Sequence, residues 1–85
     1  MEQSLEQRIA QMLERCEDLI LASIDGEGFP RPVPMCKIHF AGINEVWVST
    51  GADSVKVAQF REKPKAGLCY LEKGRAMVMT GHVEI

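Results

Sequence analysis

Residues 45–64 read EVWVSTGADSVKVAQFREKP, and the fold of the chain is decided in this stretch. Residues 45–49 are mostly apolar and rich in strand-forming side chains, and Gly51 marks a turn after them. A short helix is predicted from Ser54 until just before Lys63-Pro64, because the residue that precedes a proline disfavours the helical conformation. An apolar strand therefore leads through a tight turn directly into a helix.

The junction between this strand and helix has the chemistry of an anion site. Ser49, Thr50 and Ser54 carry hydroxyl groups, Lys56 carries a positive charge, and the first N–H groups of a helix lack acceptors within it. We interpret the junction as a cradle for a nucleotide phosphate. The same residues allow a plainer interpretation, in which Asp53 caps the helix while Ser54 and Lys56 are only solvated.

The size and composition of the chain limit its possible classes. Its 85 residues predict one domain over residues 1–85, and a partner subunit would help so short a chain to bury its surface. A net charge of -2 argues against nucleic acid as the main partner. The sequence has no signal-peptide pattern and no apolar run long enough for a membrane span, so we expect a cytoplasmic protein without a membrane partner.

The three cysteines predict neither a disulfide framework nor a metal site. Cys16, Cys36 and Cys69 are odd in number and widely spaced, without a C-x-x-C motif. Cys36 and His39 form a C-x-x-H pair, but alternation along a strand places their side chains on opposite faces. We expect reduced thiols and no bound metal.

The remaining segments read as one further helix and two hairpins. Ser4 and Gln7 have the spacing of a capping box before an amphipathic helix at residues 5–16. In the short second helix, the predicted apolar side consists of Val55, Val57, Ala58 and Phe60. The other predicted strands are residues 19–24, 29–40, 67–71 and 75–85. This order predicts an antiparallel sheet that curls toward a barrel, with helices over its openings.

Three prolines alternate in the second predicted strand, at Pro30, Pro32 and Pro34. Proline has no N–H group, and alternate residues of a strand direct their N–H groups to the same side. The second strand is therefore predicted to have one unpaired side, which faces an edge, a ligand or a bulge.

Taken together, these segments resemble the pyridoxamine 5'-phosphate oxidase-like family of FMN-binding split β-barrels. The resembling segments are the N-terminal helix, LILASIDGEGFPRPVPM, VWVST followed by DSVKVAQFREKPKAGLCYL, and RAMVMTGHVEI. The resemblance covers most of the chain and implies a mainly β fold, an antiparallel split β-barrel with an N-terminal helix and a short helix between strands. Family members are usually longer, so we expect this chain to lack C-terminal strands, which are either truncated or supplied by a partner.

The resemblance also implies a cofactor and its ligands. Family members resemble one another in binding FMN at a homodimer interface, with the phosphate held by basic and hydroxyl side chains. Lys37 is near the position of flavin-contacting residues of the second strand, and a deazaflavin is an alternative to FMN. Carried onto this sequence, the implied cofactor-binding residues are Arg31, Lys37, Ser49, Thr50, Ser54 and Lys56.

The function that follows is that of a flavoprotein. No Ser/His/Asp or Cys/His arrangement and no carboxylate pair has the spacing of a catalytic group, so we name no catalytic residue and expect a flavin to supply any redox chemistry. We expect a homodimeric FMN-dependent oxidoreductase that acts on a small organic substrate, with electrons from a reduced nicotinamide. A non-catalytic flavin-binding or dimerisation module is the alternative. The C-terminal run by which true pyridoxamine-phosphate oxidases hold pyridoxal phosphate is missing, so that activity is not expected.

Overall fold

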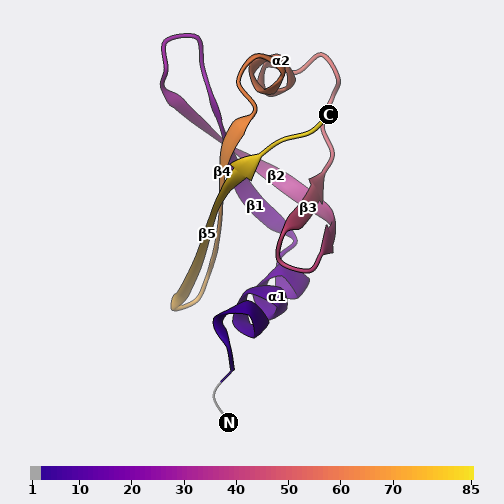
Figure 1. Cartoon of the computed structure of the whole chain (residues 1–85), viewed down its shortest axis with the longest axis vertical. Coiled ribbons are helices and arrows are strands. Elements are labelled where there is room, and N and C mark those ends of the chain that lie inside the picture. The colour runs from indigo at the N-terminus through magenta and orange to yellow at the C-terminus, as the bar shows by residue number, and fades with distance from the viewer. Residues whose placement is uncertain (1–2) are drawn as a thin grey trace.

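The computed structural model describes residues 3–85, which form two helices and five strands. In chain order these are α1 (Leu5–Arg15), β1 (Asp18–Ile24), β2 (Pro30–Ala41), β3 (Glu45–Val48), α2 (Val55–Glu62), β4 (Lys65–Glu72) and β5 (Arg75–His82). The strands form one antiparallel sheet in the order β3-β2-β1-β4-β5 (Figure 1). The two predicted hairpins are β1-β2 and β4-β5.

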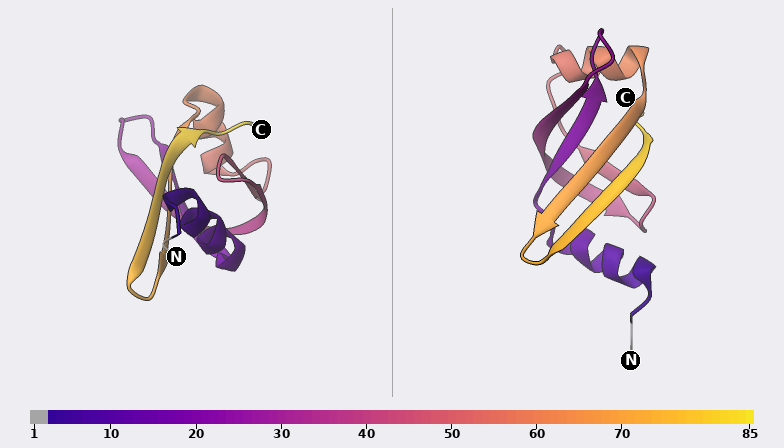
Figure 2. Two further views of the ribbon diagram at one scale, coloured as in Figure 1. Left: turned by 60° about the horizontal axis from the view of Figure 1, so that its bottom comes forward. Right: turned by 90° about the vertical axis from the view of Figure 1, so that its left-hand side faces the viewer.

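The sheet curls into half of a barrel, and the helices lie at its two ends. Figure 2 shows the tilted strands between α2 at one end and α1 at the other. This is the predicted mainly β split-barrel architecture, and the prediction that helices cover its openings is confirmed. Neither helix in residues 3–85 has the length and apolar character needed to cross a membrane.

The start of α1 is set by the predicted capping box. Ser4 Oγ accepts a hydrogen bond from the backbone N–H of Gln7 at 3.1 Å, and Gln7 Oε1 accepts one from the N–H of Ser4 at 2.9 Å. Met12 and Leu13 are buried and pack against Met77 of β5. The helix therefore closes one end of the half-barrel with its apolar side inward.

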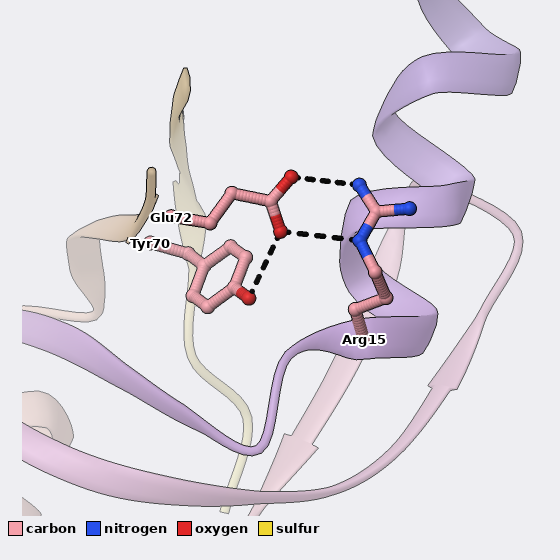
Figure 3. A network of polar contacts seen from close by, with 3 residues as sticks. All are labelled: Arg15, Tyr70 and Glu72. Carbon is pink, nitrogen blue, oxygen red and sulfur yellow. Dashed lines mark hydrogen bonds and ion pairs between the residues drawn. The ribbon is translucent and has the colours of Figure 1, made fainter. Parts of the chain in front are cut away.

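An ion pair joins the end of α1 to the sheet (Figure 3). The guanidinium of Arg15 donates from Nη2 and Nε to the two carboxylate oxygens of Glu72, at 2.7 and 3.2 Å. Tyr70 donates its hydroxyl to the same carboxylate at 3.1 Å. The hydrogen bond from Arg15 is the main reason that the pKa of Glu72 lies below its ordinary value, and the bond from Tyr70 acts in the same direction.

The inner face of β1 joins the core to α2. Leu19, Leu21 and Ser23 alternate as its buried residues, and Leu19 and Leu21 belong to the same core cluster as Phe60 of α2. Ser23 is polar but only 1% exposed, and its hydroxyl donates to Oε1 of Gln59 at 2.5 Å. This hydrogen bond satisfies a buried group and holds α2 in position on the sheet.

The prolines of β2 lie along an open edge. The N–H of Lys37 donates to the carbonyl of Glu17, at the start of the β1 pairing, so odd-numbered residues of β2 direct their N–H groups to β1. Pro30, Pro32 and Pro34 are even-numbered and face the other side, where β3 pairs only from Lys37 onward. The predicted unpaired side of this strand is confirmed.

Three predictions about element extent and burial were wrong. The strand predicted to reach residue 49 ends at Val48, and the strand predicted to reach residue 85 ends at His82. The apolar side of α2 is also narrower than predicted. Val57 and Phe60 are buried, whereas Val55 is 57% exposed and Ala58 is also exposed. The physical reason is that α2 meets the sheet mainly at β1, so one stripe of this short helix is covered.

Candidate functional site

A pocket of about 440 Å³ opens beside the junction of β3 and α2. It lies where the end of β3 and the first turn of α2 approach the paired strands β1 and β2. Its lining consists of Ser49 and Thr50 after β3, Lys56 of α2, Asp18 of β1, and Pro34, Met35 and Cys36 of β2. The structure therefore brings together three of the six predicted cofactor ligands, Ser49, Thr50 and Lys56.

Ser54, the fourth predicted ligand, lies at the margin of this pocket as the N-cap of α2. Its hydroxyl oxygen accepts a hydrogen bond from the N–H of Val57 at 3.4 Å, and Thr50 donates its hydroxyl to the same oxygen at 3.5 Å. The cap is thus Ser54, and the alternative interpretation with Asp53 as the cap was wrong. Ser is a favoured N-cap because its oxygen satisfies one of the first N–H groups of the helix.

Two sources of positive potential meet at this end of the pocket. The N–H groups of the first two residues of α2 have no acceptor within the described part of the chain. Lys56 is half-buried in the first turn, and no carboxylate of residues 3–85 lies within ion-pair distance of its amine. Hydroxyls, a free ammonium group and the start of a helix dipole together favour an anion.

The lining of the pocket also includes a carboxylate that sequence analysis did not single out. Asp18 pairs with Cys36 in the β1-β2 register, and the Cys36 thiol donates to Oδ1 of Asp18 at 3.3 Å. The bond to this carboxylate, together with its charge, raises the pKa of the Cys36 thiol. The thiol therefore keeps its proton at neutral pH. The signal that could have found Asp18 is the hairpin register, which sets it opposite Cys36.

Arg31 and Lys37, the other two predicted ligands, do not line the pocket. Arg31 pairs with Ser23 near the far end of β2. The Lys37 amine donates to the carbonyl of Leu13 in the last turn of α1 and lies 5.0 Å from the ring centre of Phe40. Cations are favoured at helix C-termini, where carbonyl groups lack partners. Lys37 therefore stabilises the packing of α1 in this structure.

The fold and the pocket define a mainly β protein of the split-barrel class. A family model described as pyridoxamine 5'-phosphate oxidase matches residues 5–85, which is nearly the whole chain. This chain belongs to the pyridoxamine 5'-phosphate oxidase family. Comparison with curated proteins gave no match.

Three solved structures have the same fold. A protein from Clostridium acetobutylicum related to general stress protein 26 of B. subtilis is 16% identical, with a TM-score of 0.84 over 99% of this chain and 61% of that one. A conserved hypothetical protein of Mycobacterium tuberculosis is 21% identical, with a TM-score of 0.80 over 96% of this chain and 56% of that one. A pyridoxamine 5'-phosphate oxidase-related, FMN-binding protein from Nostoc punctiforme is 21% identical, with a TM-score of 0.77 over 95% of this chain and 47% of that one.

This chain spans between 47% and 61% of the lengths of these three structures. At such low identities the likeness concerns the fold, and FMN binding is the stated property of the Nostoc protein.

Proposed function

We propose that this chain binds FMN, with the phosphate held at the β3-α2 junction. We further propose that it is a flavin-dependent oxidoreductase that acts on a small organic substrate. The observation that carries the proposal is the convergence of Ser49, Thr50 and Lys56 on one pocket at a helix N-terminus. Membership of a family with an FMN-binding relative supports the same ligand.

The donor set fits a terminal phosphate. A phosphate monoester carries roughly two negative charges at neutral pH and three acceptor oxygens. Ser49 and Thr50 offer hydroxyl donors, Lys56 offers an ammonium group, and the first N–H groups of α2 point out of the helix. The volume of about 440 Å³ also lies in the range of small-molecule sites, roughly 300–1,000 Å³.

The residues of the chain would bind and orient the cofactor. Lys56 and the hydroxyls would hold its anionic end, while Pro34 and Met35 offer apolar surface on the β2 side. A bound flavin supplies the electron or hydride transfer, which no side chain of this site can perform.

We also propose a homodimer as the working assembly. Leu71 and Val78 are diagonal neighbours on the β4-β5 pair and are 78% and 76% exposed. Exposed apolar side chains that adjoin one another on a sheet favour burial against another surface. A second copy of the chain would cover this face and add the contacts that so small a domain lacks.

The first test is an absorbance spectrum and a solution mass on one purified sample. We expect flavin bands near about 370 and about 450 nm on a species of twice the 9.5 kDa chain mass. Lys56→Ala should weaken FMN binding by about tenfold or more, as loss of a charge-assisted hydrogen bond implies. Lys73→Ala, the same change in the β4-β5 turn, is the matched control and should leave binding unchanged.

The outcomes separate the parts of the proposal. A colourless protein that does not take up added FMN overturns flavin binding. If the flavin is bound but neither NADH nor NADPH bleaches it, and no acceptor reoxidises it, the oxidoreductase part fails and a non-catalytic flavin module remains. Preferential uptake of a deazaflavin would change the cofactor and leave the phosphate site standing.

A further inference from the structure

The two edges of the sheet differ in how they are protected against pairing with another chain. One edge consists of β3, which has only 4 residues, and of the half of β2 that carries the prolines. The other edge is β5, the outermost strand on its side of the sheet (Figure 2), which has 8 residues and no proline. Short strands and prolines are features that prevent pairing at a sheet edge. Neither of them is present in β5.

The outer side of β5 carries unpaired backbone groups. The N–H of Val83 donates to the carbonyl of Pro64, at the end of the β4-β5 pairing, so odd-numbered residues of β5 direct their N–H groups to β4. The even-numbered residues direct theirs outward, where residues 3–85 provide no neighbouring strand. The register with β4 has no shift, so this side of β5 is a regular template for a further strand. The outward-directed residues are all exposed, and they are Ala76, Val78, Thr80 and His82.

The start of this edge and the end of the same chain are complementary in charge. A pocket of about 490 Å³ between α1 and β5 is lined mainly by apolar residues, together with Arg8 and Arg75. No carboxylate lines this pocket, and neither arginine forms an ion pair within residues 3–85. Glu84 and Ile85, which follow β5, are exposed and offer one acidic and one apolar side chain.

From these observations we infer that β5 is the dimerisation strand of this protein. Two copies join their β5 edges in antiparallel orientation about a two-fold axis, and the sheet continues from one copy into the other. The end of one β5 then lies beside the start of the other, so Glu84 of each copy comes near Arg75 and Arg8 of its partner. The contact is isologous, because both copies use the same residues. The inference rests on the proposed homodimer and names the element that forms it.

A proline at Val78 tests the backbone pairing. Val78→Pro keeps an apolar side chain and removes one outward N–H group, while the hydrogen bonds between β5 and β4 are retained. We expect it to raise the dissociation constant of the dimer, measured by sedimentation, by about tenfold or more. Val78→Thr is the matched control, because it keeps the N–H group, and should raise the constant less than about threefold. A Val78→Pro dimer as strong as the wild type, or a greater loss in Val78→Thr, overturns edge pairing.

An exchange of charges tests the antiparallel orientation. Arg75→Glu should weaken the dimer by about fivefold, because its carboxylate then repels Glu84 of the other copy. Adding Glu84→Arg to this variant should restore most of the loss. Arg61→Glu, the same change in α2, is the control and should leave the dimer unchanged. If the second substitution restores nothing, the two chain ends do not meet and the inference is wrong.

Amide exchange in the wild type gives a test that needs no substitution. The N–H groups of Val78 and Thr80 should exchange about tenfold more slowly in a concentrated, dimeric sample than in a dilute sample of single chains. Nuclear magnetic resonance measures the two rates for each residue. Equal rates in the two samples would show that the β5 edge stays open in the dimer, and would overturn the inference even if Val78→Pro does not fold.

The same samples distinguish this inference from the function it rests on. If Val78→Pro dimerises as well as the wild type, edge pairing fails and the proposed homodimer stands. If the copies pair through β5 but FMN is not bound, the proposed flavin function fails and β5 keeps its role. A wild type that remains a single chain at about 1 mM overturns both the homodimer and its contact through β5.

Discussion

Ser54 shows how one side chain can serve both stability and binding. Its oxygen caps α2 through the N–H of Val57 and accepts from Thr50, which lines the pocket. Capping needs only an acceptor at this position, whereas a phosphate needs a donor or at least no added negative charge. These two demands can be separated by substitution.

We expect Ser54→Ala to destabilise the protein by about 1 kcal/mol, as loss of an N-cap does. Ser54→Asp should keep stability within about 0.5 kcal/mol, because Asp is an equally good cap. The same variant should weaken FMN binding at least about tenfold, since its carboxylate repels the phosphate. Denaturant unfolding and an FMN titration of each variant give the two quantities.

Ser4→Ala provides the control for this pair, because Ser4 caps α1 and does not line the pocket. It should cost a similar amount of stability and leave FMN binding unchanged. Wild-type affinity for FMN in Ser54→Asp would remove Ser54 from the proposed phosphate site.

Glu72 makes part of the stability depend on pH. Its pKa is lowered in the folded state, first by the hydrogen bond from Arg15. A carboxyl whose pKa is lowered in the folded state stabilises the protein at pH values above its unfolded-state pKa. This stabilisation is lost as the pH falls through the folded-state pKa. The stabilisation by Glu72 is therefore present at neutral pH and absent in acid.

Glu72→Gln should accordingly lower the denaturant midpoint at pH 7 and have a smaller effect at about pH 3, where the carboxyl of the wild type is more fully protonated. Unfolding curves of the variant and the wild type at the two pH values check this. Glu84→Gln is the control, because Glu84 is exposed and makes no ion pair within residues 3–85. An equal difference at both pH values would show that packing, and not the ion pair with Arg15, carries the effect.

At the scale of elements, β2 is a strand with two different halves. The half from Lys37 to Ala41 pairs with β3, whereas the half from Pro30 to Cys36 pairs with β1. Prolines remove the N–H groups that would otherwise recruit another strand to this open side. They also leave the edge beside the pocket free of strand pairing.

Restoring those N–H groups should promote association between sheet edges. The double substitution of Pro30 and Pro32 by Val should increase light scattering with time and concentration relative to the wild type. Pro64→Val, outside the sheet, is the matched control and should not. If the double variant scatters no more than this control, the prolines do not protect the edge.

At the scale of the whole molecule, cofactor and assembly should be linked. If FMN lies at a homodimer interface, as the family resemblance implies, it binds the dimer more tightly than the single chain, and mass action then favours the dimer. Sedimentation of dilute protein should show the average mass rise from 9.5 kDa toward twice that value as FMN is added. Lys56→Ala should need about tenfold more FMN for the same rise.

If the average mass does not change with FMN at concentrations where single chains are present, the flavin pocket is not part of the dimer interface. The flavin site would then be complete within one chain.

Much of the fold was predictable because its signals are local. The capping box at Ser4 and Gln7, the prolines of β2 and the helix end before Pro64 depend on residues close together in the chain. The predictions that were wrong concern Val55 and the ends of two strands, which depend on how far a neighbouring element reaches.

The site was predictable only in part. Ser49, Thr50 and Ser54 lie within one short junction, and so does Lys56, so the sequence predicts their grouping. Lys37 was predicted as a cofactor ligand, but in the structure its amine bonds to the carbonyl of Leu13 on another element. No local pattern indicates which of several partners a long, flexible lysine side chain will reach.

By itself, the sequence determined the order of helices and strands, the unpaired side of β2 and the hydroxyl-rich start of α2. These features follow from backbone preferences and side-chain spacing over a few residues. Only the tertiary structure decided that Asp18 and Lys56 line one pocket, and that Arg31 and Lys37 lie outside it. The physical reason is that a pocket forms between elements, and its lining depends on strand register and on the curl of the sheet.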